Sequence, residues 1–367
     1  MAIRRLALFI DGTWNTAESN TNVLRLYNLT ANQVTDPFCQ QIRFYHVGVG
    51  TNWHDHVRGA FGKGINTSIR NCYQWLAETY QSNDKIFIFG FSRGAFIARS
   101  LTGFIDRMGL IYDSSSASVS EAFELYRGTT SPIASEQFDG QHNLITSQTN
   151  WARVSSRPVE VDFLGVWDTV RYYDVPLGSV RGLSRAENLF HFIQPGRSVR
   201  RLYQALAIDE QRAPYRPELW RLPGSEPDER QTTMEQRWFT GVHSNIGGGY
   251  KDNALSDLAL EWMQRMAEEA GLGFTQSVSL SGLEHLAPIV DSYSKFLGGT
   301  YRFIPGHSRY IRPLVNFDNH TEVTNQVIDG SVFERWRALG NYRPPNVESW
   351  ATSRGLAVGE LYGQRSL

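Results

Sequence analysis

The sequence predicts an α/β fold in which a mostly parallel sheet carries helices on both faces. Two observations indicate this class. Short apolar runs typical of buried strands alternate with segments whose apolar residues recur at helical spacing. Several of these runs end in a polar residue, as expected where the carboxyl ends of parallel strands form a ligand-binding edge. A large sheet with long insertions can occupy 367 residues, so we predict a single domain over 1–367.

The elements follow from this alternation in chain order. Strands are predicted at 6–10, 43–50, 85–90, 159–167 and 237–242, and helices at 65–80, 95–101 and 256–270. Residues 112–150 have loop composition, with only 121–127 expected to be helical, and we predict a loop-rich insertion that serves as a lid. Residues 272–367 are a C-terminal elaboration. Its aromatic, arginine-rich stretch 301–312 is predicted to be a hairpin, with a substrate or membrane contact as the alternative.

Composition excludes several classes of protein. The net charge is -1, with 36 basic and 37 acidic residues, which predicts no nucleic-acid partner. The two cysteines, Cys39 and Cys72, lack the number for a disulfide framework and the spacing for a metal site, and we predict neither metal nor cofactor. The apolar run 6–10 is too short for a signal peptide and no run could span a bilayer. We therefore expect synthesis in the cytoplasm, with signal-independent export left open.

Ser92 lies in the sequence Gly-Phe-Ser-Arg-Gly at 90–94, directly between a predicted strand and a predicted helix. A chain with 32 glycines produces such a string readily by chance, so the setting decides. A nucleophilic serine needs a sharp strand-to-helix turn, in which Gly90 and Gly94 tolerate the crowding and the hydroxyl projects above the sheet. The setting predicts Ser92 as the nucleophile. The alternative is a tight turn whose glycines serve only the backbone.

The serine hydroxyl needs a histidine to accept its proton and a carboxylate to orient the imidazole. In such folds the acid and then the histidine follow the serine along the chain. His243 ends a predicted strand and precedes a glycine-rich turn, and Asp168 ends the strand after that of Ser92. The other downstream candidates are Asp162 within that strand, Asp209 among residues that look helical, and the histidines His191, His285, His307 and His320.

The oxyanion of the tetrahedral intermediate needs two backbone N–H donors. Arg93, the residue after the nucleophile, is predicted to supply the first. The loop that follows strand 6–10 is the natural source of the second, from Gly12 or Thr13, because a glycine lets the backbone approach closely. Asp11 is expected to hold this loop in shape.

Six strings carry a family resemblance: LFIDGTWN at 8–15, GFSRGA at 90–95, FLGVWDTV at 163–170, AIDEQRAP at 207–214, WFTGVHS at 238–244 and SVFERW at 331–336. Together they resemble the α/β-hydrolase family, long labelled a domain of unknown function, that includes the first class of type VI secretion phospholipase effectors. The resemblance implies an α/β-hydrolase fold, a triad of Ser92, Asp168 and His243, and action on phospholipid esters. It also implies an antibacterial effector, with a secretion apparatus or an immunity protein as partner. Asn245 departs from the family, which usually has Asp there.

Four other functions remain as alternatives. The string Ile10-Asp11-Gly12-Thr13 resembles haloacid dehalogenase phosphatases, but Phe9 occupies the position of their nucleophile and cannot accept a phosphoryl group. A metal hydrolase could use Asp11, Asp168 and His243 around a divalent ion. The chain could also be a soluble carboxylesterase or lipase with no effector role. Finally, it could be a catalytically silent binding module, because a fold does not prove a function.

Overall fold

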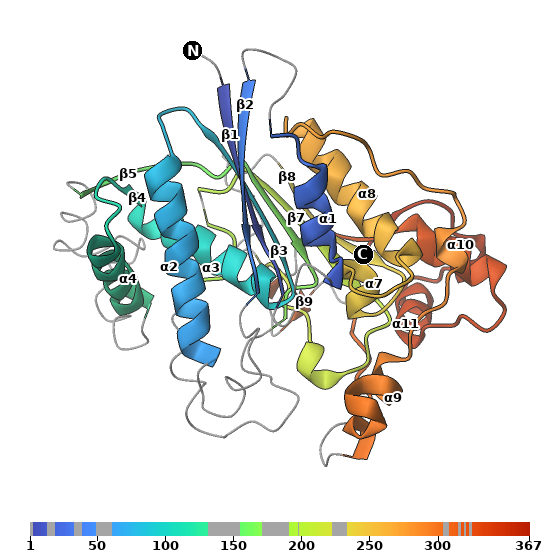
Figure 1. The fold of residues 1–367 in the computed structure, drawn as a ribbon. Helices are drawn as coiled ribbons and strands as arrows, with labels where there is room; N and C mark the ends of the chain where they lie inside the picture. The colour runs from blue at the N-terminus through green and yellow to red at the C-terminus, as the bar shows by residue number, and fades with distance from the viewer. Residues whose placement is uncertain are drawn as a thin grey trace.

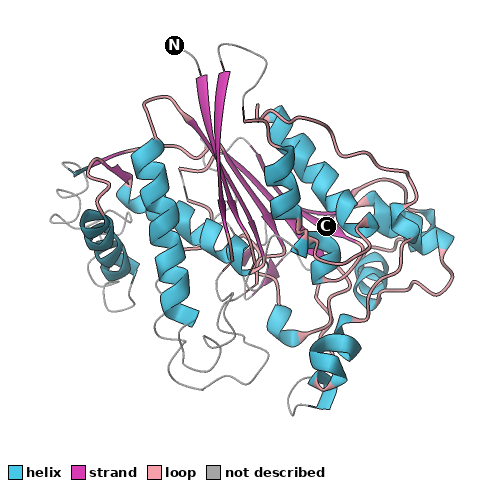
Figure 2. Cartoon of the chain, viewed as in Figure 1, coloured by secondary structure: helices cyan, strands magenta, loops and turns pink. Residues whose placement is uncertain are grey.

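The architecture was analysed in a computed structural model, which describes residues 3–12, 19–32, 39–48, 61–130, 155–170, 191–196, 198–221, 233–303, 308–314, 317–318, 321–322 and 325–367. Within these residues an eight-stranded sheet has the order β12-β11-β8-β7-β6-β3-β1-β2. Helices cover both faces of this sheet (Figures 1 and 2). The fold is therefore of the predicted α/β class, with a mostly parallel sheet.

The strands of the sheet are parallel except for the last, β12, which pairs antiparallel with β11. They are β1 (Ile3–Ile10), β2 (Cys39–His46), β3 (Lys85–Phe91), β6 (Phe163–Trp167), β7 (Arg201–Ala207), β8 (Thr233–Phe239), β11 (Gln326–Ile328) and β12 (Arg365–Ser366). In the described part of the chain, two short antiparallel pairs lie outside it: β4 (Leu110–Ile111) with β5 (Ser156–Arg157), and β9 (Phe317–Asp318) with β10 (Thr321–Glu322). Strand β3, which leads to Ser92, is central, between β1 and β6.

Two apolar layers sandwich the sheet. On one face, α2 (Phe61–Thr79) and α3 (Arg93–Met108) pack on β1, β3 and β6, and α4 (Ser116–Thr130) packs against α2 and α3. On the other face lie α1 (Asn22–Leu29) and α8 (Ala254–Glu269). A third apolar cluster joins β8 and β11 to α10 (Gly330–Ala338) and α11 (Pro345–Ser353). The remaining α-helices, α7 (His243–Gly247) and α9 (Ser292–Lys295), are short.

Most predicted elements are present with shifted ends. The predicted strand 43–50 begins earlier, at Cys39, and the predicted strand 159–167 begins later, at Phe163. The expectation of helical neighbours for Asp209 was wrong, because β7 leads directly to this residue. Leu202 and Leu206 are four residues apart, as on one face of a helix, but every residue from Leu202 to Ala207 is buried. This segment forms a strand because its side chains are buried on both faces of the sheet.

The insertion begins with a helix, α4, that is longer than the predicted 121–127. Phe123 and Tyr126 of α4 pack against Phe104 of α3, with ring centroids 5.5 and 5.1 Å apart. Residues 131–150 of the predicted lid lie outside the described residues. The predicted hairpin at 301–312 is wrong for the part that the structure describes, since 301–303 is a 3-10 turn and Arg309 makes one isolated bridge to Arg212.

Candidate active site

Ser92 lies at the sharp turn between β3 and α3, with φ 58° and ψ -120°. A positive φ is strained for a residue with a side chain and persists only where the surroundings hold it. Here the surroundings are tight. A Cβ on Gly94 would lie 2.3 Å from the carbonyl oxygen of Ile10, and a Cβ on Gly90 would lie 2.5 Å from that of Gly94. Both glycines are therefore required for α3 to start this close to β1 and β3.

The structure brings Ser92, His243 and Asp168 together from three separate elements. His243 Nε2 lies 2.8 Å from Ser92 Oγ, and His243 Nδ1 lies 2.5 Å from Asp168 Oδ2. Asp168 directly follows β6, as expected. His243 does not end a strand: β8 stops at Phe239, and His243 is the first residue of α7. Residues 240–242 connect the end of β8 to His243 at the start of α7.

Burial and charge set the protonation of this group. Burial opposes ionisation of Asp168, but the charge of Arg312 and the hydrogen bond from His243 outweigh it and hold the pKa of the carboxyl well below its usual range. For His243, burial outweighs the favourable bond to Asp168, so the pKa of the imidazole lies below 6.5. At neutral pH the site therefore holds a carboxylate and a neutral imidazole, which can accept a proton from Ser92.

Aromatic side chains enclose the imidazole. The ring of Phe91 lies 4.7 Å from that of His243, and the ring of Tyr215 meets it edge-on at 4.9 Å. Trp167, next to Asp168, is fully buried in the apolar core.

The loop after β1 differs in part from the prediction. Asp11 does hold its start: Oδ2 accepts hydrogen bonds from Tyr45 Oη at 2.7 Å and Thr21 Oγ1 at 2.5 Å. Gly12 N donates to Asp11 Oδ1 at 2.7 Å, so this N–H is directed at the carboxylate. The oxyanion role of Gly12 stays a prediction, and it requires this N–H to leave the carboxylate of Asp11. Thr13 lies outside the described residues, and Arg93 is the first residue of α3, as the prediction requires.

Asn245 stabilises the turn that carries His243. Its Oδ1 accepts from Val242 N at 3.2 Å, and its own N–H donates to Val242 O at 2.7 Å. An aspartate could accept the first of these bonds equally well. The departure from the family therefore preserves the helix start while removing a charge near His243.

A comparison with protein families identifies the chain. The family of type VI secretion phospholipase effectors, Tle1-like, catalytic domain, matches residues 4–266. The chain belongs to this family. The match contains Ser92, Asp168 and His243 and ends before the C-terminal region.

Individual relatives of this Tle1-like chain are distant. An uncharacterised protein of Saccharomyces cerevisiae is 28% identical over 237 residues, which cover 58% of this chain and 32% of the relative. Among solved structures, the Tle1 effector bound to the VgrG spike is 17% identical, with a TM-score of 0.38, over 68% of this chain and 52% of that chain. An uncharacterised protein from Pseudomonas aeruginosa is 17% identical, with a TM-score of 0.41, over 82% and 50%. The chain thus spans about a third to a half of these relatives.

Two groups next to the triad of this Tle1-like chain were missed by the sequence analysis. Arg312 Nη1 and Nη2 donate to the two carboxylate oxygens of Asp168, at 2.6 and 2.9 Å. Glu210 accepts from His243 N at 3.2 Å and forms a buried ion pair with Arg212 at 2.8 Å. Both arginines and Glu210 lie in stretches that the sequence had singled out, but nothing local showed that their side chains turn inward.

The metal alternative does not fit this geometry. Arg312, itself a cation, donates to both carboxylate oxygens of Asp168. The carboxylate of Asp11 accepts hydrogen bonds from Gly12, Thr21 and Tyr45. Among the described residues, no group of three or more His, Cys, Asp or Glu side chains is placed to hold a metal ion. In the same part of the chain, no helix is long and apolar enough to cross a bilayer.

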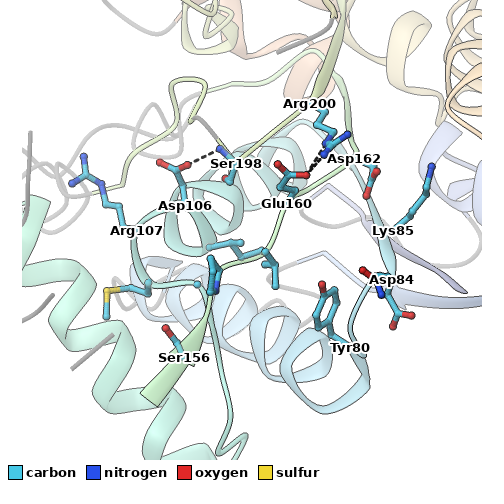
Figure 3. Close-up of a pocket in the computed structure, with 16 residues that line it drawn as sticks. Tyr80, Asp84, Lys85, Asp106, Arg107, Ser156, Glu160, Asp162, Ser198 and Arg200 are labelled. Carbon is cyan, nitrogen blue, oxygen red and sulfur yellow. Dashed lines mark hydrogen bonds and ion pairs between the residues drawn. The ribbon is translucent and has the colours of Figure 1, made fainter. Parts of the chain in front are cut away.

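A cavity of about 950 Å³ lies at the opposite edge of the sheet (Figure 3). Lys85 at the start of β3, Asp162 just before β6 and Arg200 just before β7 line it, so it faces the amino ends of the strands. Its charged groups are partly paired: Arg200 binds Glu160, and Asp106 Oδ1 accepts from Ser198 N at 2.7 Å. This cavity is therefore separate from the triad, which lies at the carboxyl ends.

Proposed function

We propose that the chain is a serine hydrolase that cleaves carboxylic esters of phospholipids through Ser92, His243 and Asp168. The observation that carries this proposal is the continuous hydrogen-bonded chain from Ser92 Oγ through both ring nitrogens of His243 to Asp168. Membership of a phospholipase effector family supports an esterase or phospholipase. A soluble carboxylesterase and a silent binding module are the outcomes against which the proposal is tested.

The geometry supports a two-step acyl transfer. Ser92 Oγ attacks the ester carbonyl while His243 Nε2 takes the hydroxyl proton, and the same nitrogen returns it to the leaving alcohol. Water then attacks the acyl-enzyme while His243 Nε2 takes a proton from it. The bond to Ser92 Oγ breaks, His243 returns the proton to Oγ, and the fatty acid is released. Asp168 stabilises the imidazolium that forms transiently. The oxyanion would be bound by the N–H of Arg93 at the start of α3 and by an N–H of the loop that contains Thr13.

The family also supports a biological setting. We propose that the chain is made in the cytoplasm and delivered by the type VI apparatus to a target cell, where it degrades membrane lipids. A secretion-apparatus protein and an immunity protein would then be its partners. The solved Tle1 effector was bound to a VgrG spike, and a pull-down with the cognate spike protein tests this for the present chain.

The nucleophile is tested with Ser92→Ala. We expect loss of at least about 10³-fold in ester hydrolysis and loss of labelling by a fluorophosphonate probe, with unchanged unfolding. Ser100→Ala is the matched control, because Ser100 is also buried and bonds a histidine, His191 Nδ1 at 2.5 Å, but from within α3. Ser92→Ala activity within about tenfold of wild type would reject the assignment.

The substrate is tested by product analysis. Fatty acid should be released from phosphatidylethanolamine or phosphatidylglycerol vesicles faster than from short-chain esters at equal ester concentration. Cleavage of short esters without release of fatty acid from vesicles or detergent-mixed phospholipid would leave a soluble carboxylesterase. If the protein cleaved neither vesicle phospholipids nor short-chain esters and did not react with the fluorophosphonate probe, the silent binding module would be the remaining function.

A further inference from the structure

Arg312 is a buried residue in an exposed segment of the C-terminal region. Its neighbours Ile311 and Pro313 are exposed, whereas the side chain of Arg312 has no exposed surface. Asn346 Nδ2 fixes the backbone at this point by donating to Arg312 O at 3.1 Å and to Ile208 O at 2.9 Å. Burying a guanidinium is costly unless it is paired, so its partners indicate its role.

The main partner of Arg312 is the carboxylate of Asp168, each oxygen of which accepts two hydrogen bonds. Oδ1 accepts from Arg312 Nη1 at 2.6 Å and from Ala207 N at 3.1 Å. Oδ2 accepts from His243 Nδ1 at 2.5 Å and from Arg312 Nη2 at 2.9 Å. Arg312 also donates to the backbone carbonyl oxygens of Ala207 and Tyr215. A planar guanidinium that binds both oxygens sets the plane of the carboxylate as well as its charge.

The charge of Arg312 also acts on His243 through Asp168. A carboxylate favours the protonated form of a neighbouring imidazole, and a cation on the same carboxylate opposes this. Arg312 therefore offsets much of the attraction that Asp168 would exert on a proton at His243. The other charged and titratable groups around the imidazole are Glu210 and Arg212 after β7, Tyr215, and Tyr250, which bonds to Ser244.

We propose that Arg312 is a positioning residue of the triad, which fixes the plane of Asp168 for His243 and sets the pH at which His243 becomes protonated. The inference rests on the proposed function for its effect on the rate. Its effect on His243 does not depend on turnover. Arg312 keeps the imidazole neutral and ready to accept a proton under conditions in which an unpaired carboxylate would hold it protonated.

The test compares Arg312→Met and Arg312→Lys with wild type. In Arg312→Met, the acid limb of kcat/KM for a soluble short-chain ester should move to higher pH by about one unit, since a cation is removed from the carboxylate. The value of kcat should also fall by tenfold or more, on the order expected for a misplaced catalytic group, with little change in KM. Arg312→Lys should keep the position of the limb but not kcat, because an ammonium cannot bind both oxygens in a fixed plane.

The matched control is Arg335→Met. Arg335 is also buried and donates to two backbone carbonyls, of His285 and Ala287, but touches no triad residue. It should lower stability without moving the acid limb. Folding of each variant is checked by circular dichroism, and Arg312→Gln replaces Arg312→Met if the latter does not fold.

A second readout is independent of turnover. The imidazole signals of His243 are titrated by NMR in a Ser92→Ala background, with and without the change at Arg312. A higher midpoint without Arg312 supports the inference, and an unchanged or lower midpoint in a folded variant overturns it. Wild type that hydrolyses no ester would reject the proposed function, while this titration would still decide the inference.

Discussion

Replacing Gly94 by alanine tests whether the close contact between α3 and the end of β1 holds Ser92 in place. The added methyl group would lie 2.3 Å from Ile10 O and 2.4 Å from Asp11 O. Ordinary contacts of carbon atoms need roughly 3.5 Å, so α3 or the end of β1 must move by about 1 Å. Displacement of catalytic groups by that amount costs about 10²-fold in rate, and overpacking costs about 1–3 kcal/mol of stability.

The assay is the second-order rate of fluorophosphonate labelling at Ser92, measured beside unfolding in denaturant. Gly340→Ala is the matched control, because nothing lies within 4 Å of a Cβ at that position. Gly94→Ala should label about 10²-fold more slowly than this control. If Gly94→Ala labelled at the control rate and unfolded at the same denaturant concentration, the packing argument for the strained turn would be refuted.

Three further predictions follow from the protonation and charge of the site and its surroundings. Burial lowers the pKa of His243, so the pH–rate profile of wild type should rise along an acid limb centred below pH 6.5, and a midpoint above 6.5 would contradict this. Asp168→Asn should retain more activity than His243→Ala but lose about 3–5 kcal/mol in denaturant unfolding, because Arg312 stays buried without its counter-charge; a loss under about 1 kcal/mol would count against that ion pair. Burial raises the pKa of Asp209 from 3.8 to about 6, so the folded state binds this proton more tightly and stability falls as pH rises through that window. Asp209→Asn should therefore gain stability relative to wild type between pH 4 and pH 7, and a constant difference across that range would disprove the assignment.

The sharp turn at Ser92 was predictable because its signals are local. Ser92, its two glycines, the strand before it and the helix after it occupy one continuous segment. Asp168 and His243 could be chosen from chain order and from the ends of apolar runs, although His243 was expected on a strand and begins a helix. Both choices depended on which edge of the sheet each residue reaches, and the direction of the strands determines that edge.

Other parts of the site depend on contacts that no local pattern reveals. Arg312 lies 144 residues from Asp168 in sequence, and its neighbours are exposed, so its inward direction follows only from the completed fold. The direction of the Gly12 N–H depends on how the carboxylate of Asp11 turns within its loop. The apolar residues of β7 have helical spacing, but the segment forms a strand because it is buried in the centre of the sheet.

The position of Arg312 limits where the chain can be truncated without loss of a group that binds Asp168. The family match ends at residue 266, which suggests a catalytic unit that could be produced by itself. A chain cut there would retain Ser92, Asp168 and His243, yet it would lose the cation bound to Asp168 and the strand β11 beside β8. Protease trimming or recombination at this boundary should therefore yield a fragment with every triad residue and an impaired active site. The proposed catalytic unit of this protein therefore extends past residue 266, where the family match ends, and includes Arg312.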